Sequence, residues 1–274
     1  MDRRTFLAGT TGTVGGVCGL AGCAGLVGDG GSGVTSREFP DRPDEFTPET
    51  VTEYVAEYEE VRTHNAHVES GAVDVSVTAV ATFDHAAVDD HYATAQHAGT
   101  VSHEDGSGGR SVGELAGDPT PYLVTPARTL RMDVSRRRVD AEDRAYLDDA
   151  TTDQPLGVRT CNVTDDPREL SITVVRREVA PDNESDLSAE SGGGETDAVV
   201  ETPVTVEPES ALELRGITDV RGSYRVTARM AENGVTSEGR IEAGLPSTDR
   251  GPNVDVVVDD DGISTRHLPS FEPI

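Results

Sequence analysis

The first long periodic segment of the chain has the residue spacing of a helix. Thr47 can cap its N-terminus, and Pro48 fits the first helical position, where its missing N–H group costs nothing. We predict a helix that runs to about Val68. Its apolar face would be formed by Val51, Tyr54, Val55, Tyr58 and Val61.

The next segment changes to the alternating pattern of half-buried strands. Residues 73–83 alternate apolar and mostly polar side chains, residues 91–103 could form a second strand, and residues 121–134 could form a third. One helix followed by antiparallel strands predicts an α+β domain over residues 47–135, with the helix packed on an antiparallel sheet.

From residue 156 onward the pattern is all β. Seven short strand candidates separated by turns predict a β-sandwich over residues 156–268. The densely charged residues 136–155 are expected to form a connector with a short helix. Residues 181–197 are acidic and rich in Gly and Ser, which predicts a disordered loop. The strand candidates are 156–163, 169–178, 198–206, 211–217, 222–230, 234–243 and 254–258.

One segment of the second region, from Asp219 to Val226, resembles the entry to strand F of immunoglobulin-like domains. Gly222 stands two residues before Tyr224, and the apolar Val226 stands two residues after it. Val226 replaces the cysteine of antibody-type domains, so the resemblance implies a disulfide-free, immunoglobulin-like sandwich. It also implies that the Tyr224 ring fills the core and that its hydroxyl bonds to backbone near the preceding turn.

The N-terminus carries two motifs in a meaningful order. Arg3 and Arg4 begin a sequence that resembles the Arg-Arg-x-Phe-Leu core of twin-arginine export signals, and the segment up to Gly28 is only mildly apolar. Leu20-Ala21-Gly22-Cys23 is similar to a lipobox, in which the cysteine thiol receives a lipid. The resemblance implies a signal peptide at 1–22 and lipidation of Cys23, followed by a flexible tether at 23–46.

Net charge changes the picture of the environment. The chain has 51 acidic and 23 basic residues, a net charge of −28, and no lysine. Such self-repulsion destabilises a compact state unless salt screens it, and at molar salt the screening length is about 3 Å. With the export motifs, this composition resembles haloarchaeal lipoproteins exported by the twin-arginine pathway, a family that implies no activity. A field of this sign also argues against nucleic acid as a partner.

Three cysteines leave little scope for disulfides. Cys18 lies in the expected signal peptide, Cys23 would be lipidated, and Cys161 would remain alone, as a small buried thiol in a strand. Two sequons, at Asn162 and Asn183, permit glycosylation outside the cell.

Histidine is the one cluster of chemically active residues that the sequence suggests. Six of the seven histidines lie between residues 64 and 103. Residues six apart on a strand are about 20 Å apart, whereas metal ligands must lie about 2 Å from one ion. We therefore favour exposed histidines over a metal site. The candidate ligands, should a site exist, are His64, His67, His91 and His97.

These observations favour a binding protein over an enzyme. The chain contains no Gly-x-Ser-x-Gly, His-Glu-x-x-His or Cys-x-x-Cys motif, and no cofactor is expected. We expect a non-enzymatic lipoprotein, anchored through Cys23 on the outer face of the cytoplasmic membrane, that binds an extracellular protein or glycan. The alternative is a histidine-dependent, metal-binding envelope protein or metallohydrolase.

Overall fold

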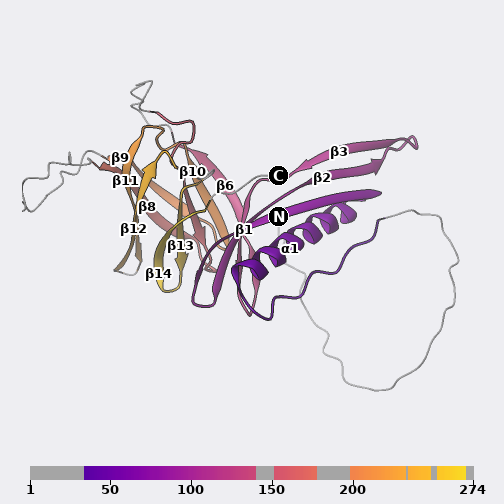
Figure 1. Cartoon of the computed structure of the whole chain (residues 1–274), viewed down its shortest axis with the longest axis horizontal. Helices are drawn as coiled ribbons and strands as arrows, with labels where there is room; N and C mark the ends of the chain where they lie inside the picture. The colour runs from indigo at the N-terminus through magenta and orange to yellow at the C-terminus, as the bar shows by residue number, and fades with distance from the viewer. Residues whose placement is uncertain (1–33, 140–150, 178–197, 233, 248–251, 270–274) are drawn as a thin grey trace, which may run out of the picture. The chain divides into compact units, whose positions relative to one another are not determined.

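The computed structural model describes most of the chain downstream of the N-terminal segment (Figure 1). Within the described residues the chain forms one helix and fourteen strands, most of them paired antiparallel, so the protein is rich in β-structure. The described residues are 34–139, 151–177, 198–232, 234–247 and 252–269.

The helix forms where the sequence predicts it. Helix α1 spans Pro48–Glu69, and Thr47 caps it through a reciprocal hydrogen-bonded pair with Thr50. The cap satisfies backbone N–H groups that would otherwise lack partners at the helix start. The face predicted to be apolar is the one that packs against the strands, through Val51, Tyr54 and Val55.

A five-stranded antiparallel sheet, which we call the first sheet, lies against α1 (Figure 1). Its strand order is β1-β2-β4-β5, and β3 pairs with the far half of β2. A shared core of α1 and strand residues, including the fully buried Tyr122 and Val124, holds the helix to the sheet. The strands are β1 (Asp74–Ala87), β2 (Asp90–Glu104), β3 (Arg110–Ala116), β4 (Thr120–Val124) and β5 (Thr129–Arg131).

The remaining strands form two further sheets. The mixed sheet has the order β14-β13-β7-β10-β6, with parallel pairing of β13 to β7 and of β6 to β10; the four-stranded sheet has the antiparallel order β12-β11-β8-β9. The strands are β6 (Asp133–Arg138), β7 (Val158–Asn162), β8 (Arg168–Arg177), β9 (Ala198–Val206), β10 (Ser210–Arg215), β11 (Gly222–Glu232), β12 (Val235–Leu245), β13 (Val254–Asp259) and β14 (Gly262–His267).

The mixed and four-stranded sheets share one hydrophobic core. Buried side chains from both, such as Leu214 and Val256 on one side and Ile172 and Val226 on the other, belong to a single cluster. Tyr224 is fully buried in this cluster, and its hydroxyl donates a 2.6 Å hydrogen bond to the Val220 carbonyl. The predicted role of the Tyr224 ring and hydroxyl is thereby confirmed.

A second cluster joins the mixed sheet to the first sheet. Tyr92 and Leu123 pack with Cys161, Ala211 and Val257 across this junction. The described residues accordingly belong to one compact unit. The separation into domains at 47–135 and 156–268 stays a prediction.

The sequence-based strand assignment needs several corrections. The strand predicted at 121–134 is three strands, β4, β5 and β6, because the chain turns at Thr125–Arg128 and passes at Met132 from pairing with β4 to pairing with β10. Strand β6 also continues to Arg138, into the range expected to be a connector. Strands β3 and β14 were not among the predicted elements.

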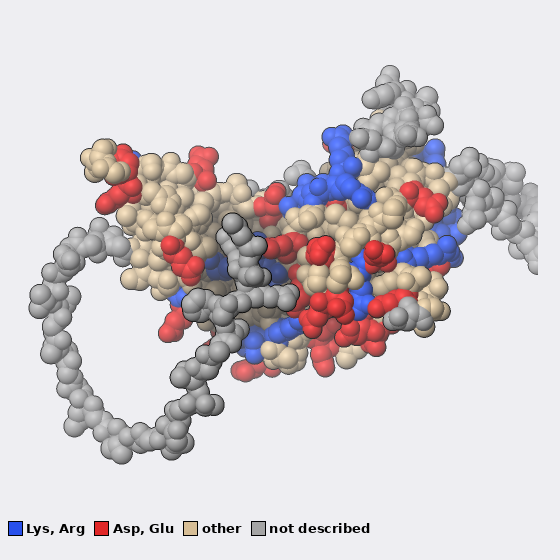
Figure 2. Space-filling view, turned by 180° about the vertical axis from the view of Figure 1, so that it is seen from behind, with Lys and Arg blue, Asp and Glu red and all other residues tan. Residues whose placement is uncertain are grey.

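The charged surface is uneven. On the face seen in Figure 2, acidic side chains gather into a continuous cluster, and basic side chains lie in separate groups beside it. Because every basic residue is arginine, each basic group offers several N–H donors in a fixed plane.

Candidate functional site

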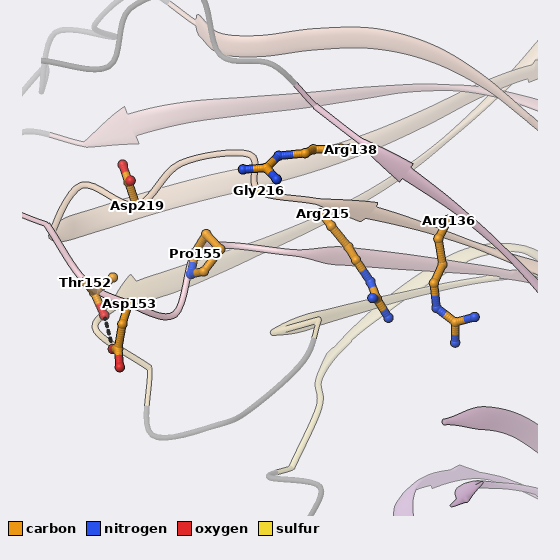
Figure 3. Close-up of a pocket in the computed structure, with 8 residues that line it drawn as sticks. All are labelled: Arg136, Arg138, Thr152, Asp153, Pro155, Arg215, Gly216 and Asp219. Carbon is orange, nitrogen blue, oxygen red and sulfur yellow. Dashed lines mark hydrogen bonds between the residues drawn. The ribbon is translucent and has the colours of Figure 1, made fainter. Parts of the chain in front are cut away.

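A pocket lined by three arginines and two aspartates lies where β6 and the end of β10 meet two loops (Figure 3). Its volume is about 580 Å³, within the range of small-molecule sites. Its lining residues are Arg136 and Arg138 from β6, Arg215 from β10, Gly216 and Asp219 from the loop after β10, and Thr152, Asp153 and Pro155 from the segment before β7.

Backbone hydrogen bonds fix the two loops that form one end of the pocket. The Thr152 N–H donates to the Asp219 carbonyl at 2.8 Å, and the Ile217 N–H donates to the Leu156 carbonyl at 3.0 Å. Gly216 lies where the chain leaves β10 and has a φ of 70°, a left-handed conformation that residues with a side chain rarely adopt. The pocket is thus built from strands and tied loops.

Two of the three arginines share one buried carboxylate. Glu213 Oε2 accepts hydrogen bonds from Arg136 Nε at 3.1 Å and from Arg215 Nε and Nη2 at 2.8 and 2.5 Å. Arg136 also bonds to Asp118, whose side chain is 73% exposed, so water screens that pair. Glu213 balances one of the two guanidinium groups, and Asp153 and Asp219, which also line the pocket, supply two further negative charges.

Arg138 adds a third positive charge beside them. In the parallel pairing of β6 and β10, Arg138 is the register partner of Arg215, as Arg136 is of Glu213. Like charges on directly neighbouring strand positions are destabilising. Within the described part of the chain, the Arg138 guanidinium has no hydrogen-bond or ion-pair partner, and in Figure 3 it extends away from Arg215 toward Gly216.

A second hollow of about 480 Å³ continues from the first. It shares Asp153, Pro155, Arg215 and Gly216 with the pocket and adds Gln154, Gly157 and Pro252. The Gln154 side-chain oxygen is buried and has no hydrogen-bond partner among the described residues. A buried acceptor without a partner is costly, so this atom can accept from a donor that enters the hollow.

A buried ionic network ties the first sheet to the mixed sheet. Arg159 binds Asp255 through two hydrogen bonds of 2.9 Å each and Asp84 through one of 2.7 Å. Burial alone would raise the pKa of Asp255, but the Arg159 guanidinium and the bond from His85 hold it well below its usual range. The side chains of Arg159, Asp84 and Asp255 are almost completely buried and bonded to one another, so we assign the network a structural role.

His85 and Cys161 both contact Asp255 in this network, but they do not contact each other as a catalytic base and nucleophile would. His85 Nε2 lies 3.0 Å from Asp255 Oδ2, and its buried Nδ1 has no hydrogen-bond partner in the described ranges. Cys161 is a buried free thiol in contact with Asp255 and not with His85. Burial and the Asp255 charge raise the pKa of Cys161 well above its usual value, which disfavours the reactive thiolate. The thiol is buried in a strand, as the sequence predicted.

A second buried network fastens α1 to the first sheet. Glu59, on the helix, accepts hydrogen bonds from His97 Nδ1 at 2.7 Å and from the Tyr122 hydroxyl, and Arg131 Nε lies 3.3 Å away. Burial and the adjacent Glu59 carboxylate raise the pKa of Tyr122 above its usual range. Sequence reasoning did not find Glu59, because it identified only the apolar residues of the helix face.

The structure does not assemble the four histidines considered as metal ligands. His91 stacks on Phe46 just before α1, whereas His64 and His67 lie more than four turns away near its other end. His64 binds the Thr35 carbonyl through Nε2, and His97 binds Glu59. In the described segments, no three His, Cys, Asp or Glu residues form a group that could hold a metal ion.

The residues of the predicted export and anchoring motifs lie outside the described residues. Arg3, Arg4 and Cys23 precede residue 34, as does the whole predicted signal peptide, and the predicted 181–197 loop is likewise not described. Among the helices of the described chain, none is long and apolar enough to cross a membrane.

The Asn162 sequon is not accessible in the folded protein. Asn162 is fully buried, and its amide nitrogen donates to three backbone carbonyls, while its oxygen accepts from the Thr164 N–H and hydroxyl. A protein exported already folded, as the twin-arginine motif implies, would present no acceptor there. The Asn183 sequon lies outside the described residues.

Comparison with known proteins adds no relative: no family model, no curated protein and no solved structure matches the chain.

Proposed function

We propose that this chain is a non-enzymatic, lipid-anchored protein of the cell surface whose folded part binds a ligand outside the cytoplasmic membrane. In this proposal the twin-arginine signal exports the folded chain, Cys23 carries the lipid, and residues 24–46 separate the folded part from the membrane. The acidic, lysine-free composition adapts the protein to concentrated salt.

The proposal of a binding function is supported by the difference between the buried charged networks and the charged side chains that line the pockets. The two acid–base networks, centred on Asp255 and Glu59, are buried and internally bonded, and none of their charged side chains lines the 580 Å³ or the 480 Å³ pocket. The charged groups that line the 580 Å³ pocket are three arginines, which bind anions and do not exchange protons at ordinary pH, and two carboxylates, Asp153 and Asp219. Such a lining suits the binding of a charged or polar ligand.

An immunoglobulin-like sandwich is the finer fold that we propose for strands β7–β14. The Tyr224 hydroxyl bond to the carbonyl four residues earlier, beside a core shared by two sheets, supports it. In domains of this kind, the loops at one end of the sandwich can bind a ligand. The pocket is lined by such loops, at 152–155 and 216–219, which suits binding of an extracellular protein or glycan.

Replacement of the lipobox cysteine tests the surface anchor. We expect Cys23→Ser to release the protein from membranes into the soluble fraction, because the thiol that would receive the lipid is gone. Cys18→Ser is the matched control, since it removes a cysteine five residues away and should leave the protein in the membrane pellet. Replacement of Arg3 and Arg4 by lysine should retain the precursor inside the cell.

Two results would overturn this proposal. One is a Cys23→Ser protein that still pellets with membranes washed in molar salt, which would mean that something other than a lipid holds it there. The other is a stoichiometric transition metal in protein purified without a histidine tag, which would favour the metal-dependent alternative.

A further inference from the structure

We infer that the edge of β3 pairs with β3 of a second copy of this chain, in antiparallel orientation about a two-fold axis at Val112. The inference goes beyond the proposed ligand binding and uses none of the residues that line the pockets at the end of β10. It follows from the backbone groups that β3 leaves open and from the order of charges along the strand.

The outer edge of β3 has open hydrogen-bonding groups. Among the described strands β3 pairs only with β2, and in Figure 1 it is the outermost strand of its part of the first sheet. Its ladder with β2 is flanked by hydrogen bonds that Gly109 accepts and Gly117 donates, at 2.8 Å each. Because bonded pairs alternate along an antiparallel ladder, the odd-numbered residues of β3 bond to β2. The N–H and C=O groups of Arg110, Val112 and Glu114 therefore point away from β2.

The sequence of β3 lacks the features that usually keep sheet edges apart. Proline, bulges and repelling charges prevent many natural edge strands from pairing with other chains. β3 contains no proline, and its register with β2 is unbroken. Val112, at its centre, is 68% exposed. The strand is thus free to accept another strand at its edge.

The other sheet edges are less suited to self-pairing. Side-chain bonds tie the edges of the mixed and four-stranded sheets to each other: Ser237 of β12 accepts from the Ile263 N–H of β14, and Arg137 of β6 donates to Thr202 of β9. Strand β1, the opposite edge of the first sheet, contains two aspartates and no arginine. Two copies of β1 therefore cannot pair carboxylate with guanidinium groups.

The order of charges along β3 selects one register. In a pair centred on Val112, Arg110 of each copy lies opposite Glu114 of the other, and the two Val112 side chains are neighbours. These residues also supply the open backbone groups, and their side chains share one face because they are two residues apart. A pair centred on Ser111 or Gly113 would place Val112 opposite a charged side chain and would pair no arginine with a glutamate.

The two charged side chains are available for this contact. Glu114 is exposed and forms no ion pair in the described part of the chain. Arg110 pairs with Asp74 at 2.7 Å, but both side chains are more than half exposed, so water screens the pair. The guanidinium group has five N–H donors and can bond to Glu114 of the second copy as well.

The salt and the membrane both favour such a pair. At molar ionic strength the screening length is about 3 Å, so the charge of −28 on each copy no longer opposes their approach at a distance. In the function proposed above, lipid anchors hold the copies on one membrane, which raises their local concentration. This last step rests on the proposed function, whereas the pairing of the strands does not.

Sedimentation of the full-length chain in molar KCl tests the pairing. The chain carries Cys18→Ser and Cys23→Ser, so the lipid anchor plays no part. One strand edge is smaller than a standard interface, so we expect dimers at roughly 0.1 mM protein and above. Arg110→Glu and Glu114→Arg should each weaken the dimer by about tenfold, because each places like charges opposite one another at both ends of the pair.

A mixture of the two variants distinguishes the proposed contact from a general effect of charge. Mixed in equal amounts, Arg110→Glu and Glu114→Arg chains should form dimers again, since every arginine then lies opposite a glutamate. Glu201→Arg makes the same change of charge at an exposed position of β9 and should leave dimer formation unchanged.

Oxidative cross-linking tests the register. Val112→Cys should form a disulfide-linked dimer, because the Cα atoms of a bonded antiparallel pair lie about 5.5 Å apart, within the range of a disulfide. Glu114→Cys is the matched control: its two copies would lie four residues apart along the strands, about 14 Å, and should not cross-link. The other cysteine in these chains is the buried Cys161.

Several results would overturn the inference. They are a monomer at every concentration up to about 1 mM, assembly beyond a dimer, charge reversals that leave association unchanged, or a mixture that fails to restore it. Cross-linking through residue 114 and not through residue 112 would also overturn it. Membrane release of Cys23→Ser is measured separately, so failure of the lipid anchor is distinguishable from failure of the pairing.

Discussion

At the scale of single residues, buried charges set how the elements of this protein fit together. Glu59 attaches α1 to the first sheet, and Arg159 attaches the first sheet to the mixed sheet. Removal of one member of such a buried pair leaves an uncompensated charge, at a typical cost of about 3–5 kcal/mol. These residues are therefore better probes of the architecture than most apolar ones.

Glu59 should make the protein sensitive to acid. Burial alone would raise its pKa, but hydrogen bonds from His97 and Tyr122 and the charge of Arg131 lower it overall. A depressed folded-state pKa stabilises the fold above the ordinary glutamate value of 4.5, and this contribution is lost as the pH falls through the folded-state pKa. Urea unfolding between pH 7 and pH 3 should show that Glu59→Gln has a lower free energy of unfolding than the parent at neutral pH. As the pH falls, the free energy of unfolding of the variant should decrease less than that of the parent.

The neighbouring glutamate provides the control for that measurement. Glu60 pairs with Arg37 at the surface, where both side chains are partly exposed. Glu60→Gln should change the free energy of unfolding by no more than about 0.5 kcal/mol and leave its pH dependence intact. Parallel pH curves for Glu59→Gln and the parent protein would contradict the assignment.

At the scale of elements, the sequence predicts most readily those with one buried and one exposed face. Helix α1 and strands such as β1, β8 and β9 were anticipated because one buried face leaves a period in their side chains. Strands β7 and β13 are buried on both faces, and the sequence indicated them as short apolar runs between turns. Strand β3 was missed because nearly all of its residues are exposed, so its sequence has no alternation to detect. Strand β14, which has a single fully buried residue, escaped for the same reason.

The pocket could not have been predicted in the same way. Arg136 and Arg138 stand in a charged run that is typical of a connector, and their position depends on parallel pairing with residues 213–215, far along the chain. Single-sequence patterns report which face of a strand is buried and not which strand lies beside it. The three consecutive arginines show no alternation of polar and apolar residues that would have indicated a strand.

Strand β6 predicts where an independently folding fragment must begin. We expect residues 133–269 to unfold cooperatively in molar KCl and residues 156–268 to be less stable. The shorter fragment lacks β6, so the edge of β10 is exposed and the buried Glu213 loses its hydrogen bond from Arg136. Circular dichroism during urea unfolding measures both, and equal stability of the two fragments would contradict the role given to β6.

Tyr224 supplies the internal control for the longer fragment. Tyr224→Phe removes only the bond to the Val220 carbonyl, at about 1–3 kcal/mol, whereas Tyr224→Ala also empties a buried site, at about 3–5 kcal/mol. This order of stabilities should hold in the fragment if its core is the one seen in the whole chain.

At the scale of the whole molecule, charge is the dominant property. With 51 acidic and 23 basic residues, much of the acidic surface has no counter-charge within reach. The arginines of the described chain are mostly engaged with carboxylates, as in the pairs of Arg225 and Arg177 with Glu242. The excess carboxylates depend on ions from solution to limit their mutual repulsion.

We therefore expect cooperative folding to be lost as KCl falls from molar to tens of millimolar, with the melting temperature falling continuously over that range. Repulsion among exposed carboxylates grows as the screening length increases from about 3 Å toward about 30 Å. The triple variant Glu53→Gln, Glu57→Gln and Glu114→Gln is the matched test, because these three side chains are exposed and form no ion pair in the described structure. If charge is the cause, the variant should keep its fold at lower salt than the parent does. Scanning calorimetry across a KCl series measures the shift, and a melting temperature independent of salt, or identical curves for variant and parent, would show that repulsion does not govern stability.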